Sequence, residues 1–315
     1  MNITKSYKNI IDWLLESENV SIQYRTLTEL LDIPESDNKV KIYKSKISDS
    51  KAVSDILGKM TQEFYWIQKK STTKEIIGDD VEYGSFATTH FCLSYLSELG
   101  MTKEHPQIEK ACERYLNLQK EDGDWWHHIT CLSGYNLRTF IRLGYKDDYR
   151  IQRTIKMLLT TERQDNGYLC DMHEKKKRNI KSCVRGATKV LLGFAELPEY
   201  WNHSRIKNLV LYFLNRGGIF KTRDKTKIVN DDMKRLSYPI IWRANIYEIL
   251  YSLSKMGYGR DERLLGAWEY LEKFKNNTGK FKLDWTPAQC PWKVGKRDEE
   301  NLWITFYILL AYKYK

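Results

Sequence analysis

The stretch QKEDGDWWHHITC, Gln119 to Cys131, sets two tryptophans, two histidines and a cysteine beside one glycine. An amphipathic run that begins at Ile108 leads into it, and a more apolar run follows it. Apolar residues at three- and four-residue steps indicate helices, and a glycine followed by an aromatic residue is typical of a helix end. The stretch is therefore expected to be the turn of a helical hairpin.

The same unit recurs along the chain, which indicates an array of helical repeats. In each copy an amphipathic segment ends in a short polar stretch, a glycine and an aromatic or aliphatic residue. The copies are Ile108–Trp126, Ile151–Leu169, Ile206–Phe220 and Leu264–Trp285. A second, more apolar helical segment follows each of them, so two layers of helices are expected.

The apolar segments decide how the array must close, because a mostly apolar helix has to be covered on most sides. A ring meets this requirement when the apolar helices lie inside and the amphipathic helices outside. The sequence therefore predicts an all-α fold, an α/α toroid with two concentric layers of about six helical hairpins. One domain is expected over residues 1–315, with a helical pair in 1–37. The further hairpin repeats are predicted over 38–103, 104–146, 147–200, 201–259 and 260–315.

Composition narrows the kind of protein. The chain has 315 residues, of which 42% are hydrophobic, enough for a sizeable core. No run approaches the ~20 apolar residues that cross a bilayer, and no signal peptide is recognised, so no membrane span and a cytoplasmic location are expected. The six cysteines lack disulfide-scaffold spacing and are expected to be reduced. The net charge of +11 fits a lysine-rich surface, and nucleic-acid binding is the least favoured function.

One turn carries a recognisable motif. Gln119, Gly123 and Trp125 form the pattern Q-x-x-x-G-x-W, which resembles the repeat of the terpenoid cyclase and protein prenyltransferase superfamily. In that family the glutamine and the tryptophan tie helix ends together. The resemblance implies a toroid whose central cavity holds an apolar or isoprenoid-like small molecule, and transferase or lyase chemistry. The D-x-D-D motif of squalene-type cyclases is absent from this chain, so the reaction, and whether there is one, stays open.

Cysteine and histidine residues fall near the predicted starts of the inner helices. Cys131 and Cys183 lie at successive helix starts, and Cys170 and His173 lie in the turn between them with C-x-x-H spacing. Three thiolates and an imidazole form a closed tetrahedral zinc site, and a helix N-terminus favours the thiolate. We therefore expect these four residues to hold zinc, with His128 as the alternative fourth ligand. Packing of the same cysteines as small core residues is the competing interpretation.

The candidate catalytic and ligand-binding residues are expected at the same end of the toroid. His128 and Asp171 are the catalytic candidates if water or substrate replaces one zinc ligand. The ligand cavity is predicted to be lined by His90, Tyr135, Arg138, Trp242 and Trp303. Aromatic residues at helical spacing can instead pack a core, and an inner-helix arginine needs a carboxylate or an anionic ligand because an unpaired buried charge is costly. Arg243 is expected to pair with Glu248 or with a neighbouring helix.

Two other functions stay open beside small-molecule binding. The missing catalytic motifs favour a non-catalytic scaffold that presents loops to a protein partner, and such a protein would have a cavity plugged by side chains. Nucleic-acid binding would require one continuous basic face.

Overall fold

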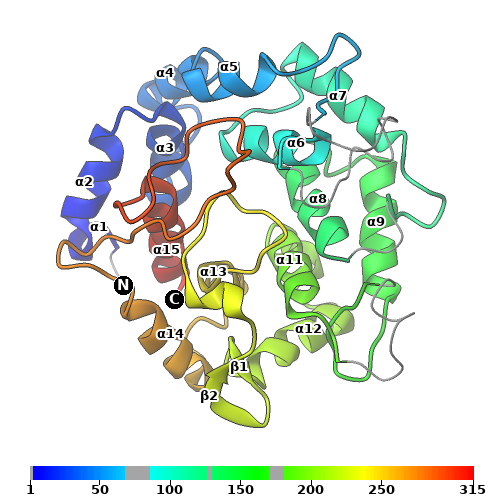
Figure 1. Ribbon diagram of the computed structural model, residues 1–315, viewed down its shortest axis with the longest axis vertical. Coiled ribbons are helices and arrows are strands. Elements are labelled where there is room, and N and C mark those ends of the chain that lie inside the picture. Colours follow the sequence, from blue (N-terminus) through cyan, green and yellow to red (C-terminus); the bar gives the residue numbers. More distant parts are fainter. Residues whose placement is uncertain (1–2, 68–85, 126–129, 171–180) are drawn as a thin grey trace.

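The computed structural model describes residues 3–67, 86–125, 130–170 and 181–315, and the chain in these ranges is mostly helical (Figure 1). Helices alternate between two layers. The outer helices are α2 (Lys8–Glu16), α4 (Asn38–Ile47), α5 (Lys51–Leu57), α7 (Pro106–Leu116), α9 (Tyr149–Thr160), α12 (Ser204–Leu214) and α14 (Leu265–Glu272). The inner helices are α3 (Val20–Arg25), α6 (Thr89–Glu98), α8 (Thr130–Arg142), α11 (Val184–Phe194), α13 (Ile246–Lys255) and α15 (Leu302–Tyr314).

Short elements complete the described chain. They are the helix α1 (Ile3–Ser6), the π-helix η1 (Thr26–Leu30), the 3-10 helices η2 (Pro198–Tyr200), η3 (Asp231–Lys234) and η4 (Glu262–Leu264), and the strands β1 (Phe220–Lys221) and β2 (Asp224–Ile228). Each outer helix and the inner helix that follows it lie within one of the segments predicted as hairpin repeats. Within the described ranges, no helix is long and apolar enough to cross a membrane.

The inner layer forms the core. Its neighbours contact one another in chain order, α6 with α8, α8 with α11, α11 with α13 and α13 with α15, and α15 also contacts α3. The pattern of side chains explains the layering. The outer helix α9 buries Ile151, Ile155 and Leu158 along one face, whereas every residue of α15 from Trp303 to Tyr312 is buried. A helix that is apolar all round requires neighbours on all sides, and Figure 1 shows the outer helices surrounding the inner ones.

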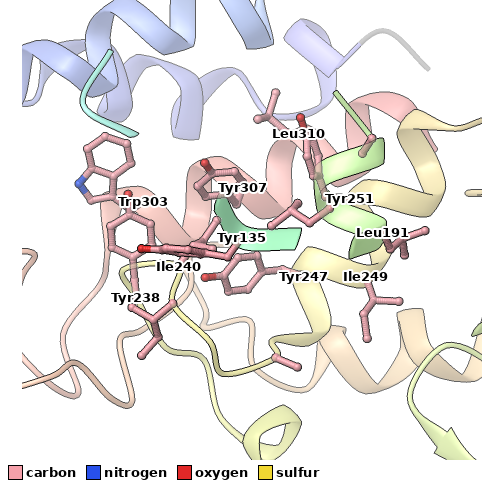
Figure 2. Packing of buried hydrophobic residues seen from close by; sticks show 14 of the residues in the cluster. Tyr135, Leu191, Tyr238, Ile240, Tyr247, Ile249, Tyr251, Trp303, Tyr307 and Leu310 are labelled. Carbon is pink, nitrogen blue, oxygen red and sulfur yellow. The ribbon is translucent and has the colours of Figure 1, made fainter. Parts of the chain in front are cut away.

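Aromatic side chains fill the space between the inner helices. Figure 2 shows Tyr247, Tyr251 and Tyr307 close together. The ring of Tyr307 lies 5.8 Å from that of Tyr247 and 6.0 Å from that of Tyr251. Close-packed aromatic side chains leave little free volume, so this part of the predicted central cavity is occupied by the protein itself.

Two inner helices approach each other unusually closely. A Cβ atom on Gly134 of α8 would clash with the backbone of Lys189 and Val190 in α11, and one on Gly193 would lie 2.9 Å from the carbonyl oxygen of Gly134. Only glycine permits this backbone-to-backbone packing. The contact fixes the relative position of the helices that carry several of the candidate site residues.

The residues Gln119 to Trp125 tie two outer helices together. The side-chain amide of Gln119 donates hydrogen bonds to the carbonyl oxygens of Gly123 (3.1 Å) and Arg150 (2.6 Å), the second of which belongs to the next outer helix. Gly123 has φ +94°, and Trp125 is buried between the rings of neighbouring residues. The turn after α9 is held by the following outer helix instead. Arg205 of α12 donates hydrogen bonds to the carbonyl oxygens of Thr161, Asn166 and Gly167.

The all-α prediction needs one correction. Strands β1 and β2 form a small antiparallel hairpin between α12 and η3, with Phe220 opposite Ile228. The sequence of β2, DKTKI, has only Ile228 as an apolar residue, so it carries too little alternation to be recognised as a strand. Gly217 and Gly218, both of which have positive φ angles, follow α12 and lead the chain into β1.

Candidate functional site

The inner helices run in the same direction, so their ends gather into two distinct groups. At the end where they begin, Phe86 before α6 contacts Trp285 of the segment before α15, with the rings 6.0 Å apart. At the end where they finish, Arg25 of α3 binds Glu98 of α6. Both pairs join residues that are distant in sequence. Each end therefore brings together side chains from several helices, and each has its own chemistry.

The amino-end cluster is the group Arg185, Asp232, Trp242, Arg243 and Trp285. Its centre is Asp232, which is 5% exposed and accepts hydrogen bonds from Arg185 Nε (2.6 Å) and Nη2 (3.0 Å) and from Arg243 Nη1 (3.0 Å). The side chains of Arg185 and Arg243 are 35% and 26% exposed. Two guanidinium groups thus share one buried carboxylate while remaining within reach of solvent.

The tryptophans hold the two guanidinium groups in place. The guanidinium carbon of Arg185 lies 4.7 Å from the ring centre of Trp242, and that of Arg243 lies 5.1 Å from Trp242 and 4.3 Å from Trp285. Cation–π contacts of this kind contribute about 0.5–2 kcal/mol each, more as water is excluded. Both indoles are partly buried. The arginines are therefore preorganised rather than free to sample many rotamers.

Local structure explains why these side chains meet. Arg185 is in the first turn of α11, and Asp232 is in η3, which begins after the side chain of Asn230 caps the backbone N–H of Asp232. Trp242 and Arg243 lie in the irregular segment just before α13, whose start is fixed by a capping box between Asn245 and Glu248. Arg243 thus pairs with Asp232 of the neighbouring helical turn η3, the second of the two alternatives expected from the sequence, and not with Glu248. Glu248 instead binds Lys189 in a fully buried ion pair.

His90, predicted to line the cavity, lies at the same end but is buried. Its side chain is 1% exposed in the first turn of α6 and packs against Phe91, with the rings 4.1 Å apart. Burial lowers the pKa of His90 to about 3, so the imidazole is neutral at physiological pH. Neither ring nitrogen has a hydrogen-bond partner in the described part of the chain.

Two of the predicted zinc ligands come together. The Sγ atom of Cys170 lies 3.4 Å from Oγ1 of Thr130, at the start of α8. A hydrogen bond from Cys131 lowers the pKa of the Cys170 thiol to about 6, although burial opposes this shift. Cys183 precedes α11, and burial raises the pKa of its thiol. Among residues 3–67, 86–125, 130–170 and 181–315, no group of three or more potential ligands is arranged to hold a metal ion.

The other sequence candidates divide between undescribed and buried positions. His128, Asp171 and His173 lie outside the described residues. Tyr135 and Trp303 are buried in the core, 4% and 1% exposed respectively. Zinc binding and the catalytic roles of His128 and Asp171 stay predictions.

Arg138 takes part in a buried ion pair, the first of the two interpretations that the sequence left open. Together with its partners it forms the carboxyl-end network, which consists of Arg25, Glu29, Glu98, Arg138, Arg142, Glu196, Lys255 and Tyr307. Glu98 is at its centre, because it accepts from Arg25 Nη1 (2.9 Å), from Arg138 and from the hydroxyl of Tyr307. Burial by itself would raise the pKa of Glu98, but Arg138 and Arg25 lower it to about 2.

Sequence reasoning missed most of this network. Arg25, Glu98 and Arg142 are the last residues of α3, α6 and α8, and Lys255 is the last residue of α13. Cations are favoured at helix carboxyl ends, where the helix dipole is negative. The recurrence of charged residues at the ends of otherwise apolar segments was the available signal. It could have indicated a shared network once parallel inner helices were assumed.

Comparisons with known proteins place the architecture but not the activity. No protein-family model matches the chain, and no curated protein sequence matches it. Among solved structures, one titled as a polysaccharide lyase has a TM-score of 0.52 and 12% sequence identity, and the match covers 98% of this chain and 97% of the other. At this identity the likeness concerns the fold alone. It extends over the whole helical array and is not specific to terpenoid cyclases.

Proposed function

We propose that this protein is a closed α/α toroid that binds an acidic saccharide at the end where its inner helices begin. The observation that carries the proposal is the amino-end cluster, in which two partly exposed guanidinium groups on tryptophan faces share a single carboxylate. Arginine is well suited to bind a carboxylate through two parallel hydrogen bonds. Flat indole surfaces suit the apolar faces of sugar rings.

The charge of the cluster favours a ligand with isolated carboxylates. Arg185 and Arg243 contribute two positive charges to the cluster and Asp232 one negative charge, so the formal charge of these three side chains is +1. One uronate carboxylate would neutralise it. An isoprenyl diphosphate, the ligand implied by the terpenoid cyclase resemblance, carries more negative charge than this cluster balances. The isoprenyl diphosphate stays the second candidate, because the aromatic pair Phe86 and Trp285 offers an apolar surface beside the arginines.

The solved structure that shares the fold is titled as a polysaccharide lyase. A saccharide ligand for this chain is consistent with that likeness, and lyase chemistry on a uronate is the reaction class to test first. Catalysis would require a base and an acid near the bound sugar. His128 and Asp171 are the sequence candidates for those roles.

The test is a titration monitored by the emission of the tryptophans. The ligands are a glucuronate-containing tetrasaccharide, a neutral tetrasaccharide of the same length, and geranylgeranyl diphosphate. We expect the acidic saccharide to bind and the neutral one to bind at least tenfold more weakly, because a charged hydrogen bond contributes about 1.5–3 kcal/mol. Ultraviolet absorbance from new unsaturated uronate ends would show lyase activity.

A matched pair of variants locates the binding. Arg243→Gln removes one guanidinium of the cluster and should weaken binding of the acidic saccharide about tenfold. Arg297→Gln is the control, because the side chain of Arg297 is 75% exposed and its one ion pair in the described part of the chain is with its neighbour Asp298. Equal binding of acidic and neutral saccharides, or an unchanged affinity in Arg243→Gln, would reject the proposal. Stronger binding of the diphosphate would favour the isoprenoid candidate.

Zinc binding is a separate proposal, supported by the contact between the Cys131 and Cys170 side chains. Elemental analysis of tag-free protein should find about one zinc per chain, lost in Cys131→Ser and Cys170→Ser. Metal-free protein would return both thiols to the role of small core residues.

A further inference from the structure

A groove on the outer layer lies away from the amino-end cluster. It has a volume of about 730 Å³ and is formed by the end of α12, the β1–β2 hairpin, η4 and α14 together with the residue that follows it. Figure 1 shows the hairpin at the edge of the molecule between these two helices. None of the five residues of the amino-end cluster lines it. We call it the hairpin groove.

The floor of the hairpin groove is apolar. It is lined by Leu214, Phe220, Ile228 and Tyr270. Phe220 is seated against two glycines, because a Cβ atom on Gly266 would lie 3.3 Å from its ring and one on Gly217 would lie 3.2 Å from it. The absence of side chains at these positions leaves the aromatic ring accessible from the groove. The floor therefore offers aliphatic and aromatic surface to a ligand.

The rim is positively charged. Lys225, Arg263 and Lys273 line the groove, against one acid, Glu269. Arg263 is paired with Asp261 at 2.6 Å, but neither lysine forms an ion pair within the described ranges. In the described part of the chain, the side chain of Lys225 donates a hydrogen bond to the carbonyl oxygen of Asn215, a neutral partner. Burial lowers the pKa of Lys225, and the nearby charge of Arg216 lowers it further.

The hairpin adds further positive charge and a free strand edge. Its sequence from Phe220 to Ile228 contains Lys221, Arg223, Lys225 and Lys227, against the single acid Asp224. Strand β2 pairs only with β1 in the described sheet, and residues Lys225 to Lys227 are exposed. An unpaired strand edge can accept an extended peptide through backbone hydrogen bonds, and side-chain pockets then give specificity.

We propose that the hairpin groove binds an acidic polypeptide segment in which carboxylates alternate with apolar side chains. The alternation matches the site, because successive residues of an extended chain point to opposite sides. Apolar side chains would enter the floor around Phe220 and Tyr270, while carboxylates would meet Lys225 and Lys273. The free strand edge favours a peptide, which can pair with it through backbone hydrogen bonds, over a nucleic acid, which would need a row of phosphate contacts.

The test uses a fluorescein-labelled heptapeptide of alternating glutamate and leucine or phenylalanine. Its control has lysine in place of every glutamate. Fluorescence anisotropy should show binding of the acidic peptide and at least tenfold weaker binding of the basic one. The affinity should fall as salt rises, because the attraction is partly between exposed charges. Equal binding of the two peptides overturns the proposal.

Three variants place the peptide on the groove. The charge reversals Lys273→Glu and Lys225→Glu/Lys273→Glu should weaken acidic-peptide binding at least tenfold. Lys120→Glu, an exposed lysine in the turn after α7, is the matched control and should bind like the unaltered protein. The side chain of Lys273 forms no hydrogen bond within the described ranges, and its ammonium lies 5.7 Å from the ring centre of Tyr270, so its reversal tests the site even if the Lys225 change perturbs the hairpin.

Two further outcomes separate this groove from other surfaces. Arg243→Gln must leave peptide affinity unchanged, since the amino-end cluster lies elsewhere. A twelve-nucleotide single-stranded oligothymidylate should compete poorly with the peptide. Loss of peptide binding in Arg243→Gln, or tighter binding of the oligothymidylate than of the peptide, overturns the assignment.

Discussion

The two ends of the inner layer use the same kinds of residue for different purposes. At the carboxyl end, Glu98 is 0% exposed, and its partners Arg25 and Arg138 are 1% and 3% exposed. At the amino end, Asp232 is nearly as buried, but its partners Arg185 and Arg243 are about a third and a quarter exposed. The arginine that stays in contact with water can exchange a solvent contact for a ligand. The arginine that is fully enclosed cannot, so its charge serves the fold.

The comparison predicts that removing the central acid is most damaging at the carboxyl end. Glu98→Gln leaves Arg25 and Arg138 buried without their carboxylate, and we expect a loss of about 3–5 kcal/mol in the free energy of unfolding. Urea unfolding followed by circular dichroism measures this loss. Glu35→Gln, which removes an exposed ion pair with Lys44, should cost no more than about 1 kcal/mol. Equal losses in both variants would show that burial does not set the energetics of these pairs.

Lowering the pH should remove the stability that Glu98 contributes to the carboxyl-end network. The pKa of Glu98 is about 2 in the folded protein against an ordinary value of 4.5. The unfolded chain takes up the proton first as the pH falls. The contribution of Glu98 is therefore fully present above pH 4.5 and is lost between pH 4.5 and 2. Unfolding free energies at several pH values should show this loss in the unaltered protein and a smaller one in Glu98→Gln.

His90, at the opposite end of α6, should affect stability in a higher pH range. His90 has a pKa of about 3 when folded and 6.5 ordinarily. Its neutral form is favoured in the folded protein, so the associated stability is present above pH 6.5 and declines as the pH falls toward 3. His90→Leu, which keeps an apolar side chain in this position, should lose less stability between pH 6.5 and 4.5 than the unaltered protein. Parallel curves would assign that loss to other groups.

The smallest effect is expected for Asp232 at the amino end, and it tests whether this cluster binds the saccharide. Asp232→Asn leaves Arg185 and Arg243 without their shared charge, so the affinity for the acidic tetrasaccharide should rise several-fold. The stability cost should stay below that of Glu98→Gln, because water screens the two partly exposed guanidinium groups. Isothermal titration calorimetry and urea unfolding on the same sample check both expectations. A fall in affinity would mean that Asp232 positions the arginines more than it competes for them.

The sequence was informative where a local pattern determines structure. Glycine-ended amphipathic segments predicted the hairpins and their alternation, because helix periodicity and helix termination are local properties. Gln119 and Trp125 were expected to tie helix ends together, and the hydrogen bond from Gln119 to Arg150 does so. The β1–β2 hairpin was not predicted, because its strands are too short and polar to produce a periodic signal.

The candidate site was harder to predict because its contacts are long-range. Arg25 and Glu98 are separated by 73 residues, and Arg185 and Asp232 by 47. Nothing in either local sequence identifies the partner. Arg138 was named as a cavity residue, and only packing decided that it faces Glu98 and Tyr307 instead. For Arg243 the sequence left Glu248 and a neighbouring helix as alternatives, because nothing near it in the chain identifies Asp232 as the partner.

The hydrogen bonds of Gln119 and Arg205 link neighbouring hairpins and so affect how the molecule unfolds locally. Gln119 binds a backbone carbonyl of α9, and Arg205 of α12 binds the backbone that follows α9. A hairpin in this region cannot detach without breaking hydrogen bonds that belong to its neighbour. Amide protons in α7, α9 and α12 should therefore exchange with solvent as one cooperative unit, at a common rate set by a shared opening event.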